Sequence, residues 1–414
     1  MIGTACYFDS QVVFYFHNMK LTQQQKDFIR QNEQSDVRKL ALKLNKDRYR
    51  RPDVEFVLKQ ISGRQTAKEK FPCCYAHDEI IYPAHLSLEQ ASSEATAKYK
   101  ASLIPGENGA FADLTGGMGV DFAFLSQRFV QSVYVEQDPE LCEIAGHNFE
   151  VLGLRGIEVE NSTSETFLKK MPPADLIFLD PSRRDDVGRK VIRIEDCSPD
   201  VSKIQDMLLA KAKLVLIKFS PMLDISLAVK SLRNVSEVHI VSVENECKEL
   251  LFLLSFKADA VVYNAVNLNK CGDIEKFCFT PEEELGLEIP FAKTVGRYLY
   301  EPNASILKAG GFKSVAKQFD IQKLHINSHL YTSDNLITAF PGRVFEVKGW
   351  FTPNKKNIKS FLSNTKKANI SVRNFPMPVA VIRQKTGLKE GGGTYLFATT
   401  VADGTMVWVT GERL

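Results

Sequence analysis

In residues 109–125, a segment with three glycines (Gly116, Gly117 and Gly119) lies between two apolar runs. Residues 109–112 are short and apolar, as in a buried strand, and residues 122–125 read as the apolar start of a helix. Between them the sequence is Asp-Leu-Thr-Gly-Gly-Met-Gly-Val-Asp. Glycine allows a tight turn and lets a ligand approach where a Cβ would block it. The order strand, glycine loop, helix predicts the ligand cradle of a doubly wound α/β fold, although a structural turn carries glycines too.

Regular alternation of strands and helices follows this loop. An apolar strand at 132–135 ends in Glu136, about 20 residues after the loop, where such folds place an acid that binds ribose hydroxyls. A helix over 139–152 comes next, then strands at 156–159 and 174–179, the second stopping at Asp180-Pro181. Further strands are expected at 214–217, 238–241 and 251–256, the last two as a hairpin. The pattern predicts a seven-stranded, doubly wound sheet.

These residues resemble the class I S-adenosylmethionine-dependent methyltransferases, with Asp-x-Thr-Gly-Gly-x-Gly in place of the dinucleotide pattern G-x-G-x-x-G. The resemblance implies S-adenosylmethionine as cofactor. It implies cofactor contacts at Asp113, Thr115, Gly116, Gly117, Met118, Gly119, Asp121, Glu136, Gln137, Ser162 and Asp180. It implies catalytic roles at Asp180, Pro181, Ser182, Arg183 and Lys218.

The Asp-Pro element leaves the type of acceptor open. Family members that hold an exocyclic amine follow Asp/Asn-Pro-Pro with a stacking aromatic, whereas Ser182 and Arg183 stand here. Uridine-C5 methyltransferases carry Asp-Pro-Pro-Arg but need a cysteine nucleophile after the fifth strand. That position reads Lys-Phe-Ser-Pro from Lys218 onward, and Cys247 is the cysteine expected at the same rim. Arg183 and Lys218 could bind a substrate anion or make ordinary structural contacts.

The segment before the glycine loop is a polar helix of small residues. Gln90, Ser92, Ser93 and Thr96 either contact the methionine end of the cofactor or permit close helix packing. Residues 22–63 carry two helical apolar stripes, so we expect a helical region at 1–100, with Met1 or Met19 as the start. The methyltransferase domain is then expected at 101–258, with a small α+β, ferredoxin-like linker domain at 259–340.

The carboxyl-terminal part, 341–414, resembles the THUMP-like domains of some bacterial methyltransferases, which hold RNA. A basic helix is expected at 354–367, and strands at 379–382, 395–397 and 406–409. Basic side chains with interleaved phenylalanines suit phosphate contact and base stacking, or form a solvated face. The basic side chains between 343 and 373 are Arg343, Lys348, Lys355, Lys356, Lys359, Lys366, Lys367 and Arg373.

Composition adds limits rather than a function. A net charge of +3 over 414 residues means that any nucleic-acid surface is local. Eight cysteines without a C-x-x-C pair predict reduced thiols, no metal site and a cytoplasmic location, and no apolar run approaches the ~20 residues that span a bilayer. The leading hypothesis is an RNA methyltransferase that binds tRNA or rRNA through the basic residues between 343 and 373. The alternatives are a methyltransferase of small molecules or proteins and a non-catalytic RNA-binding protein.

Overall fold

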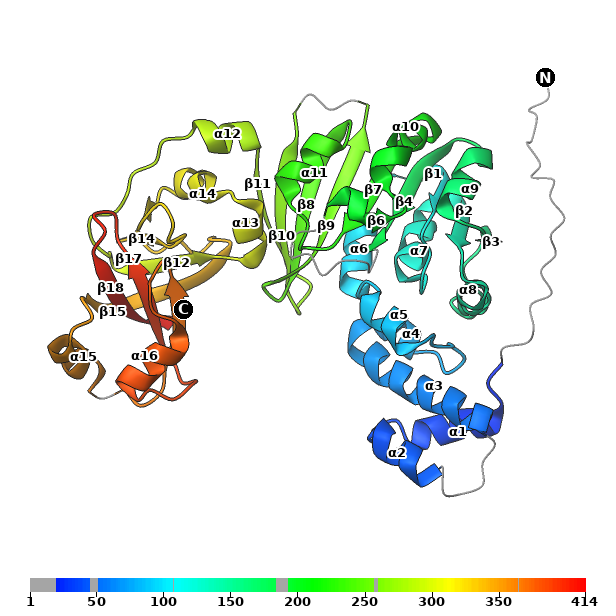
Figure 1. Cartoon of the computed structure of the whole chain (residues 1–414), viewed down its shortest axis with the longest axis horizontal. Helices are drawn as coiled ribbons and strands as arrows, with labels where there is room; N and C mark the ends of the chain where they lie inside the picture. Colours follow the sequence, from blue (N-terminus) through cyan, green and yellow to red (C-terminus); the bar gives the residue numbers. More distant parts are fainter. Residues whose placement is uncertain (1–19, 45–50, 107, 184–192, 257–259, 364) are drawn as a thin grey trace. The chain divides into compact units, whose positions relative to one another are not determined.

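The computed structural model describes residues 20–44, 51–106, 108–183, 193–256, 260–363 and 365–414. The chain divides into two compact units (Figure 1). The first comprises Met1–Asp180 with Asp206–Lys213, and the second comprises Pro181–Gln205 with Leu214–Leu414.

Helices precede the first strand of the first unit. They are α1 Gln23–Gln31, α2 Val37–Leu44, α3 Arg51–Lys70, α4 Pro72–Tyr75, α5 His85–Gln90 and α6 Glu94–Ser102. A capping box between Thr22 and Gln25 starts α1. The apolar stripes predicted for α1, α2 and α3 meet in one small core, which contains Ile29, Leu40 and Ile61.

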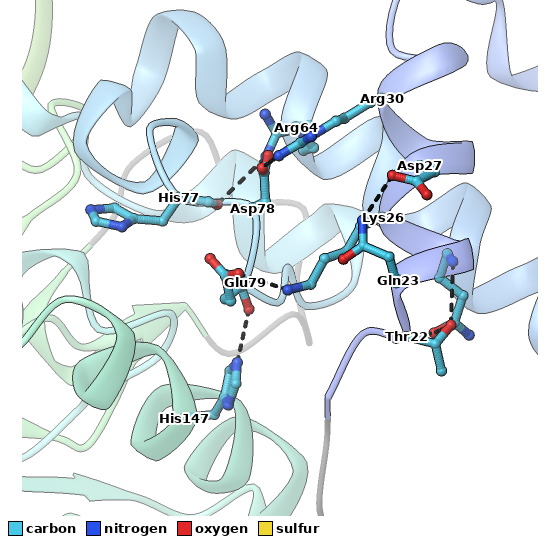
Figure 2. Close-up of polar contacts among 11 residues, drawn as sticks. Thr22, Gln23, Lys26, Asp27, Arg30, Arg64, His77, Asp78, Glu79 and His147 are labelled. Carbon is cyan, nitrogen blue, oxygen red and sulfur yellow. Dashed lines mark hydrogen bonds and ion pairs between the residues drawn. The ribbon is translucent and has the colours of Figure 1, made fainter.

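Polar contacts join this helical region to the α/β part of the same unit. Lys26 of α1 binds the Glu79 carboxylate at 2.6 Å, and the ring of His147 contacts the Glu79 carbonyl at 2.8 Å (Figure 2). The side-chain amide of Asn148 donates to the carbonyl of Ile81 and accepts its N–H. The helices are therefore bound to the segment that leads into the glycine loop.

Four parallel strands form the part of the main sheet that belongs to the first unit. The elements are β1 Asn108–Asp113, α7 Val120–Leu125, η1 Ser126–Arg128, β2 Phe129–Glu136, α8 Pro139–Val151, β3 Ile157–Asn161, α9 Ser164–Lys170 and β4 Ala174–Leu179. Strand β1 pairs with β2 and β4, and β2 pairs with β3. Rings of Phe111, Phe122, Tyr134 and Phe149 pack with centroids 4.8–5.5 Å apart beneath the glycine loop. The predicted α/β fold is confirmed.

The sheet is larger than predicted. Its order is β11-β10-β8-β9-β7-β4-β1-β2-β3, so the expectation of seven strands is wrong and the sheet has nine. The additional hairpin adds β10 in parallel to β8 and continues the sheet past residue 258. The elements from 182 to 286 are β5 Ser182–Arg183, η2 Ile194–Asp196, β6 Cys197–Ser198, α10 Val201–Lys211, β7 Ala212–Phe219, α11 Ile225–Ser231, β8 Val235–Val243, β9 Glu246–Ser255, β10 Val262–Leu268, β11 Ile274–Phe279 and α12 Pro281–Gly286.

A second sheet, in the order β13-β14-β12-β15-β18-β17-β16, forms the carboxyl-terminal α+β region. Its elements are β12 Tyr298–Pro302, α13 Ala304–Ala309, α14 Phe312–Gln318, β13 Gln322–Lys323, β14 Tyr331–Ser333, β15 Gly342–Phe351, α15 Lys355–Leu362, β16 Asn369–Arg373, α16 Val379–Thr386, β17 Thr394–Thr400 and β18 Met406–Arg413. Leu362 of α15, Ile382 of α16 and Trp408 of β18 share one apolar cluster, so both helices cover the same face. The strand predicted at 379–382 is wrong, because these residues begin α16 after Pro378 and the helix ends at Gly387 in the left-handed conformation.

Candidate active site

The three loop glycines serve different purposes. A Cβ on Gly116 would lie 2.1 Å from the Tyr134 ring, and one on Gly119 would lie 2.8 Å from the Phe149 ring. These two glycines let the loop pack on the aromatic cluster beneath it. Gly117 has a φ of +54°, and the nearest neighbouring heavy atom to its added Cβ, the Thr115 carbonyl oxygen, is 3.8 Å away. The open backbone at Gly117 is where a ligand could approach the loop.

Glu136, at the end of β2, lies directly against this loop. One carboxylate oxygen accepts the Gly117 N–H at 2.9 Å, and the other accepts the Asp138 N–H at 2.9 Å. The half-buried side chain therefore has a fixed position. Ser162 donates its N–H to the Glu136 carbonyl at 3.0 Å. The structure thus brings Glu136, Gln137 and Ser162 together at the ends of β2 and β3, with the Gln137 side chain exposed.

The ends of β1 and β4 are joined by a short polar chain. Asp113 accepts the Thr115 N–H at 2.9 Å, and Thr115 Oγ1 accepts the Asp180 N–H at 2.6 Å. Asp113 is fully buried, whereas Asp180 is half-buried. The glycine loop and the backbone of Asp180, predicted to act in one site, are therefore adjacent in the first unit.

Asp121 and Met118 are turned away from the open side of the loop. The Asp121 carboxylate accepts the Ser92 hydroxyl at 2.6 Å and pairs with Lys100 at 3.1 Å. Met118 is buried in an apolar cluster with residues of α3 and α6. Ser93, for which the sequence left cofactor contact and helix packing open, accepts the Thr96 N–H and caps the start of α6. Lys100 was not predicted as part of this site, because a lysine in a polar helix is normally solvated, whereas this one is completely buried.

Negative charge gathers at the loop. Burial raises the pKa of Asp113 well above its ordinary value, and the nearby charges of Asp121, Asp180 and Glu136 raise it further. Of these acids, Glu136 and Asp180 are partly accessible. A half-buried acidic surface beside an open glycine backbone suits a ligand that carries positive charge and vicinal hydroxyls, as S-adenosylmethionine does. The residues present fit this cofactor.

The other predicted catalytic residues belong to the second unit. Pro181 is buried, and the exposed Ser182 donates its hydroxyl to the Ser198 carbonyl at 3.4 Å. The backbone of Arg183 pairs with Cys197, but its side chain lies outside the described residues. Lys218 is buried on β7, opposite Leu251 of β9.

Cys247, the alternative nucleophile, is unsuited to that role. The side chain is half-buried at the start of β9. Burial raises the pKa of its thiol to about 11. The thiolate, which is the nucleophilic form, is therefore scarce at neutral pH.

Three of the eight basic residues predicted to bind RNA are paired with acids. The buried carboxylate of Glu301 binds Arg343 at 2.8 Å and Arg373 at 2.7 Å. Lys348 pairs with Glu346 at 2.7 Å and with Glu412 at 3.3 Å. The lysines of α15 and those just after it remain exposed. Arg343, Arg373 and Lys348 therefore fit a structural role better than the RNA contact predicted for them.

Two features are absent from the described ranges. No group of three or more His, Cys, Asp or Glu side chains there could hold a metal ion. Among the same residues, no helix combines the length and the apolar character needed to cross a bilayer.

Comparison with known proteins agrees with the fold. Residues 298–341 match a ferredoxin-like domain family, and residues 342–412 match a THUMP domain-like family. A crystal structure of a candidate methyltransferase from Porphyromonas gingivalis W83 is 32% identical, covers 94% of this chain and 97% of its own, and superposes with a TM-score of 0.84. Proteins from two Mycobacterium tuberculosis strains, both named as uncharacterized S-adenosylmethionine-dependent methyltransferases, are 21% identical over 329 residues, which is 78% of this chain and 86% of theirs.

Proposed function

Because the chain belongs to the S-adenosylmethionine-dependent methyltransferases that carry a THUMP-like carboxyl-terminal domain, we propose that it methylates RNA, with Asp180 and Pro181 aligning the acceptor. The cofactor and the methyltransferase class follow from the family. The RNA substrate and the roles of individual residues are the proposal.

The assignment of Asp180 to the same site as the glycine loop rests on one hydrogen bond. The 2.6 Å contact from the Asp180 N–H to Thr115 Oγ1 joins the end of β4 to the glycine loop. When bound, S-adenosylmethionine supplies an electrophilic methyl group on a positively charged sulfur. An enzyme for this reaction must mainly hold the acceptor in line with that group, and orientation alone contributes much of the acceleration.

We assign the binding roles to groups whose positions are already fixed. Glu136 is held by the N–H groups of Gly117 and Asp138, and it accepts hydrogen bonds from the two ribose hydroxyls. The open backbone at Gly117 would let the cofactor approach the loop. The substrate group that receives the methyl donates a hydrogen bond to the Asp180 carboxylate, which orients it.

The case for RNA comes from the carboxyl-terminal region. Lys355, Lys356 and Lys359 are exposed on α15, and Lys366 and Lys367 follow it. The family match of residues 342–412 points in the same direction, since THUMP-like domains resemble RNA-holding modules. Exposed lysines without acidic partners are the usual means of phosphate contact.

The test is methyl transfer to defined pools. The purified chain is incubated with S-adenosylmethionine labelled in the methyl group and with RNA, protein or small molecules from cells that lack the gene. We expect label in RNA, located by nucleoside mass spectrometry. Label in protein or small molecules alone would overturn the choice of RNA.

The Asp180→Ala variant tests the assignment of the acceptor position. We expect turnover to fall by about 100-fold or more, since orientation of the acceptor is lost. The affinity for S-adenosylhomocysteine should change less than about threefold, because the proposed ribose contact at Glu136 is intact. Asp180→Asn keeps the shape without the charge and separates orientation from electrostatics. Undiminished turnover in Asp180→Ala would remove Asp180 from the site.

A further inference from the structure

The second unit contains a groove of about 550 Å³ between α15 and α16. Lys355, Ile358 and Lys359 line it from α15, and Lys385 and Thr386 line it from α16. Trp408 of β18 is also part of its lining, and both helices pack on the same apolar cluster as Trp408. The volume is within the range of about 300–1,000 Å³ that is typical of ligand pockets. The groove is therefore large enough to receive a ligand rather than a single water.

The charge of this groove has one sign. Lys355 and Lys359 are four residues apart, so they lie on one face of α15, and Lys385 reaches the groove from α16. All three lysines are exposed, and none of them forms an ion pair with a described residue. No acidic residue lines the groove. The arrangement favours an anionic ligand.

Other groups favour a nucleic acid over a simple anion. Trp408 lines the groove as a completely buried side chain, and its indole N–H has no hydrogen-bond acceptor among the described residues. The Thr386 hydroxyl already donates to the Ile382 carbonyl at 2.8 Å. Phe361, on the same helix as the lysines but outside the lining of the groove, stacks on Phe351 with ring centroids 4.4 Å apart, and 47% of the residue stays exposed. An accessible aromatic ring beside lysines is the combination that binds single-stranded nucleic acids through stacking and phosphate contact.

We propose that the α15–α16 groove, defined by Lys355, Lys359, Lys385, Thr386 and Trp408, holds the phosphodiester backbone of an RNA strand. The inference rests on the proposed function and makes it more specific. It places the RNA contact at this groove and away from Arg343 and Arg373, whose charges are held by Glu301.

Two triple variants of the full-length chain test the groove with equal changes in charge. The groove variant is Lys355→Ala/Lys359→Ala/Lys385→Ala. The control is Lys270→Ala/Lys276→Ala/Lys293→Ala, which removes three exposed lysines of the same unit that lie outside both the groove and the basic segment 343–373. Binding of a fluorescein-labelled ten-nucleotide uridine oligonucleotide is measured by anisotropy between 50 and 200 mM salt.

The expected result separates the two variants. The groove variant should bind at least about tenfold more weakly, and its salt slope should be smaller by about 2, since each lost phosphate contact removes about 0.7 for a single strand. The control should lose less than about threefold. Equal losses in both variants would show general attraction to the positive surface and would overturn the proposal.

A second measurement reports on the groove itself. The chain has two tryptophans, so Trp350→Phe leaves Trp408 as the sole emitter. We expect the oligonucleotide to change Trp408 emission in this variant and not in the variant that also carries the groove substitutions. Inorganic phosphate and a ten-residue glutamate peptide serve as comparison probes. An equal response to either probe would mean that the groove recognises anions in general, which overturns the assignment to RNA.

The outcomes distinguish this inference from the proposed function. If wild-type protein methylates RNA but the groove variant binds it as well as the control does, the groove assignment fails and the function stands. If wild-type protein neither binds nor methylates RNA, the proposed function fails, and the groove assignment fails with it.

Discussion

Replacing Lys100 with methionine should destabilise the first unit by about 3–5 kcal/mol, the usual effect of removing one partner from a buried ion pair. Lys100 is completely buried, and its ammonium lies 3.1 Å from Asp121 and 3.2 Å from the Ser92 hydroxyl. Methionine retains most of the volume of the lysine stem, so little packing is lost. The main effect is a carboxylate at Asp121 that stays buried without its cation.

The chain offers a closely matched control. Lys98 lies on the same helix and pairs with Glu94 at 2.6 Å, but its side chain is 61% exposed. Surface pairs of this kind contribute about 0–1 kcal/mol, so Lys98→Met should be nearly neutral. In Lys100→Met/Asp121→Asn the buried charge is gone, and at least half of the lost stability should return.

The assay must report on the correct unit. Both tryptophans, Trp350 and Trp408, belong to the second unit, so their fluorescence does not follow the first. Hydrogen–deuterium exchange of peptides from β1 and α7 measures the free energy of opening directly, and second-unit peptides provide an internal reference. A loss below about 1 kcal/mol in Lys100→Met, or an equal loss in Lys98→Met, would refute the reasoning.

Three further predictions concern the loop and Cys247. Glu136→Ala should weaken S-adenosylhomocysteine binding by about 1–3 kcal/mol in calorimetry, while Glu160→Ala on β3 should not; an unchanged affinity for Glu136→Ala excludes the ribose contact. Burial raises the pKa of Asp113 above its ordinary 3.8, so the folded state binds this proton more tightly and the contribution of Asp113 to stability falls as the pH rises above about 4. Asp113→Asn should remove that slope from urea unfolding measured against pH, and an identical slope would contradict the assignment. With a thiol pKa of about 11, Cys247 should react slowly with iodoacetamide at pH 7. Peptide mass spectrometry measures the reaction, with the exposed Cys271 as reference. Cys247→Ala should keep full methyltransferase activity.

Local patterns in the sequence predicted the centre of the fold well. The strands that became β1 to β4 are short apolar runs, each bounded by turn residues or by an acid, and these signals lie within each segment. The contact between the glycine loop and Asp180 followed from topology, since carboxyl ends of parallel strands meet at one edge of a sheet.

The errors arose where distant residues decide the outcome. Residues 379–382 are apolar and three of the four are β-branched, as in a strand. In the helix Ile382 is buried, and the other three residues are half-buried or exposed. The hairpin of β10 and β11 joins the sheet through long-range pairing with β8 that no local pattern displays. Arg343 and Arg373 were predicted to contact RNA because they belong to a basic segment. Their pairing with Glu301 was missed, since Glu301 is far away in the sequence.

The predicted cofactor residues divide in the same way. Gly117, Glu136 and Asp180 have accessible groups at the loop, as their positions after strands indicated. Asp121 has the expected place in the sequence, but its carboxylate is occupied by Lys100 and Ser92. Only the folded arrangement of α6 against α7 reveals this pairing.

The segment before the glycine loop is held by two side-chain amides in a way that separates its stability from that of the sheet. Gln60 binds both backbone groups of Tyr82, and Asn148 binds both backbone groups of Ile81. Each amide imitates a neighbouring strand without belonging to one. Residues 80–82 therefore do not belong to a cooperative ladder of backbone hydrogen bonds. In Gln60→Leu or Asn148→Leu, the amides of these residues should together lose protection against hydrogen exchange, while the β-sheet amides exchange as slowly as before.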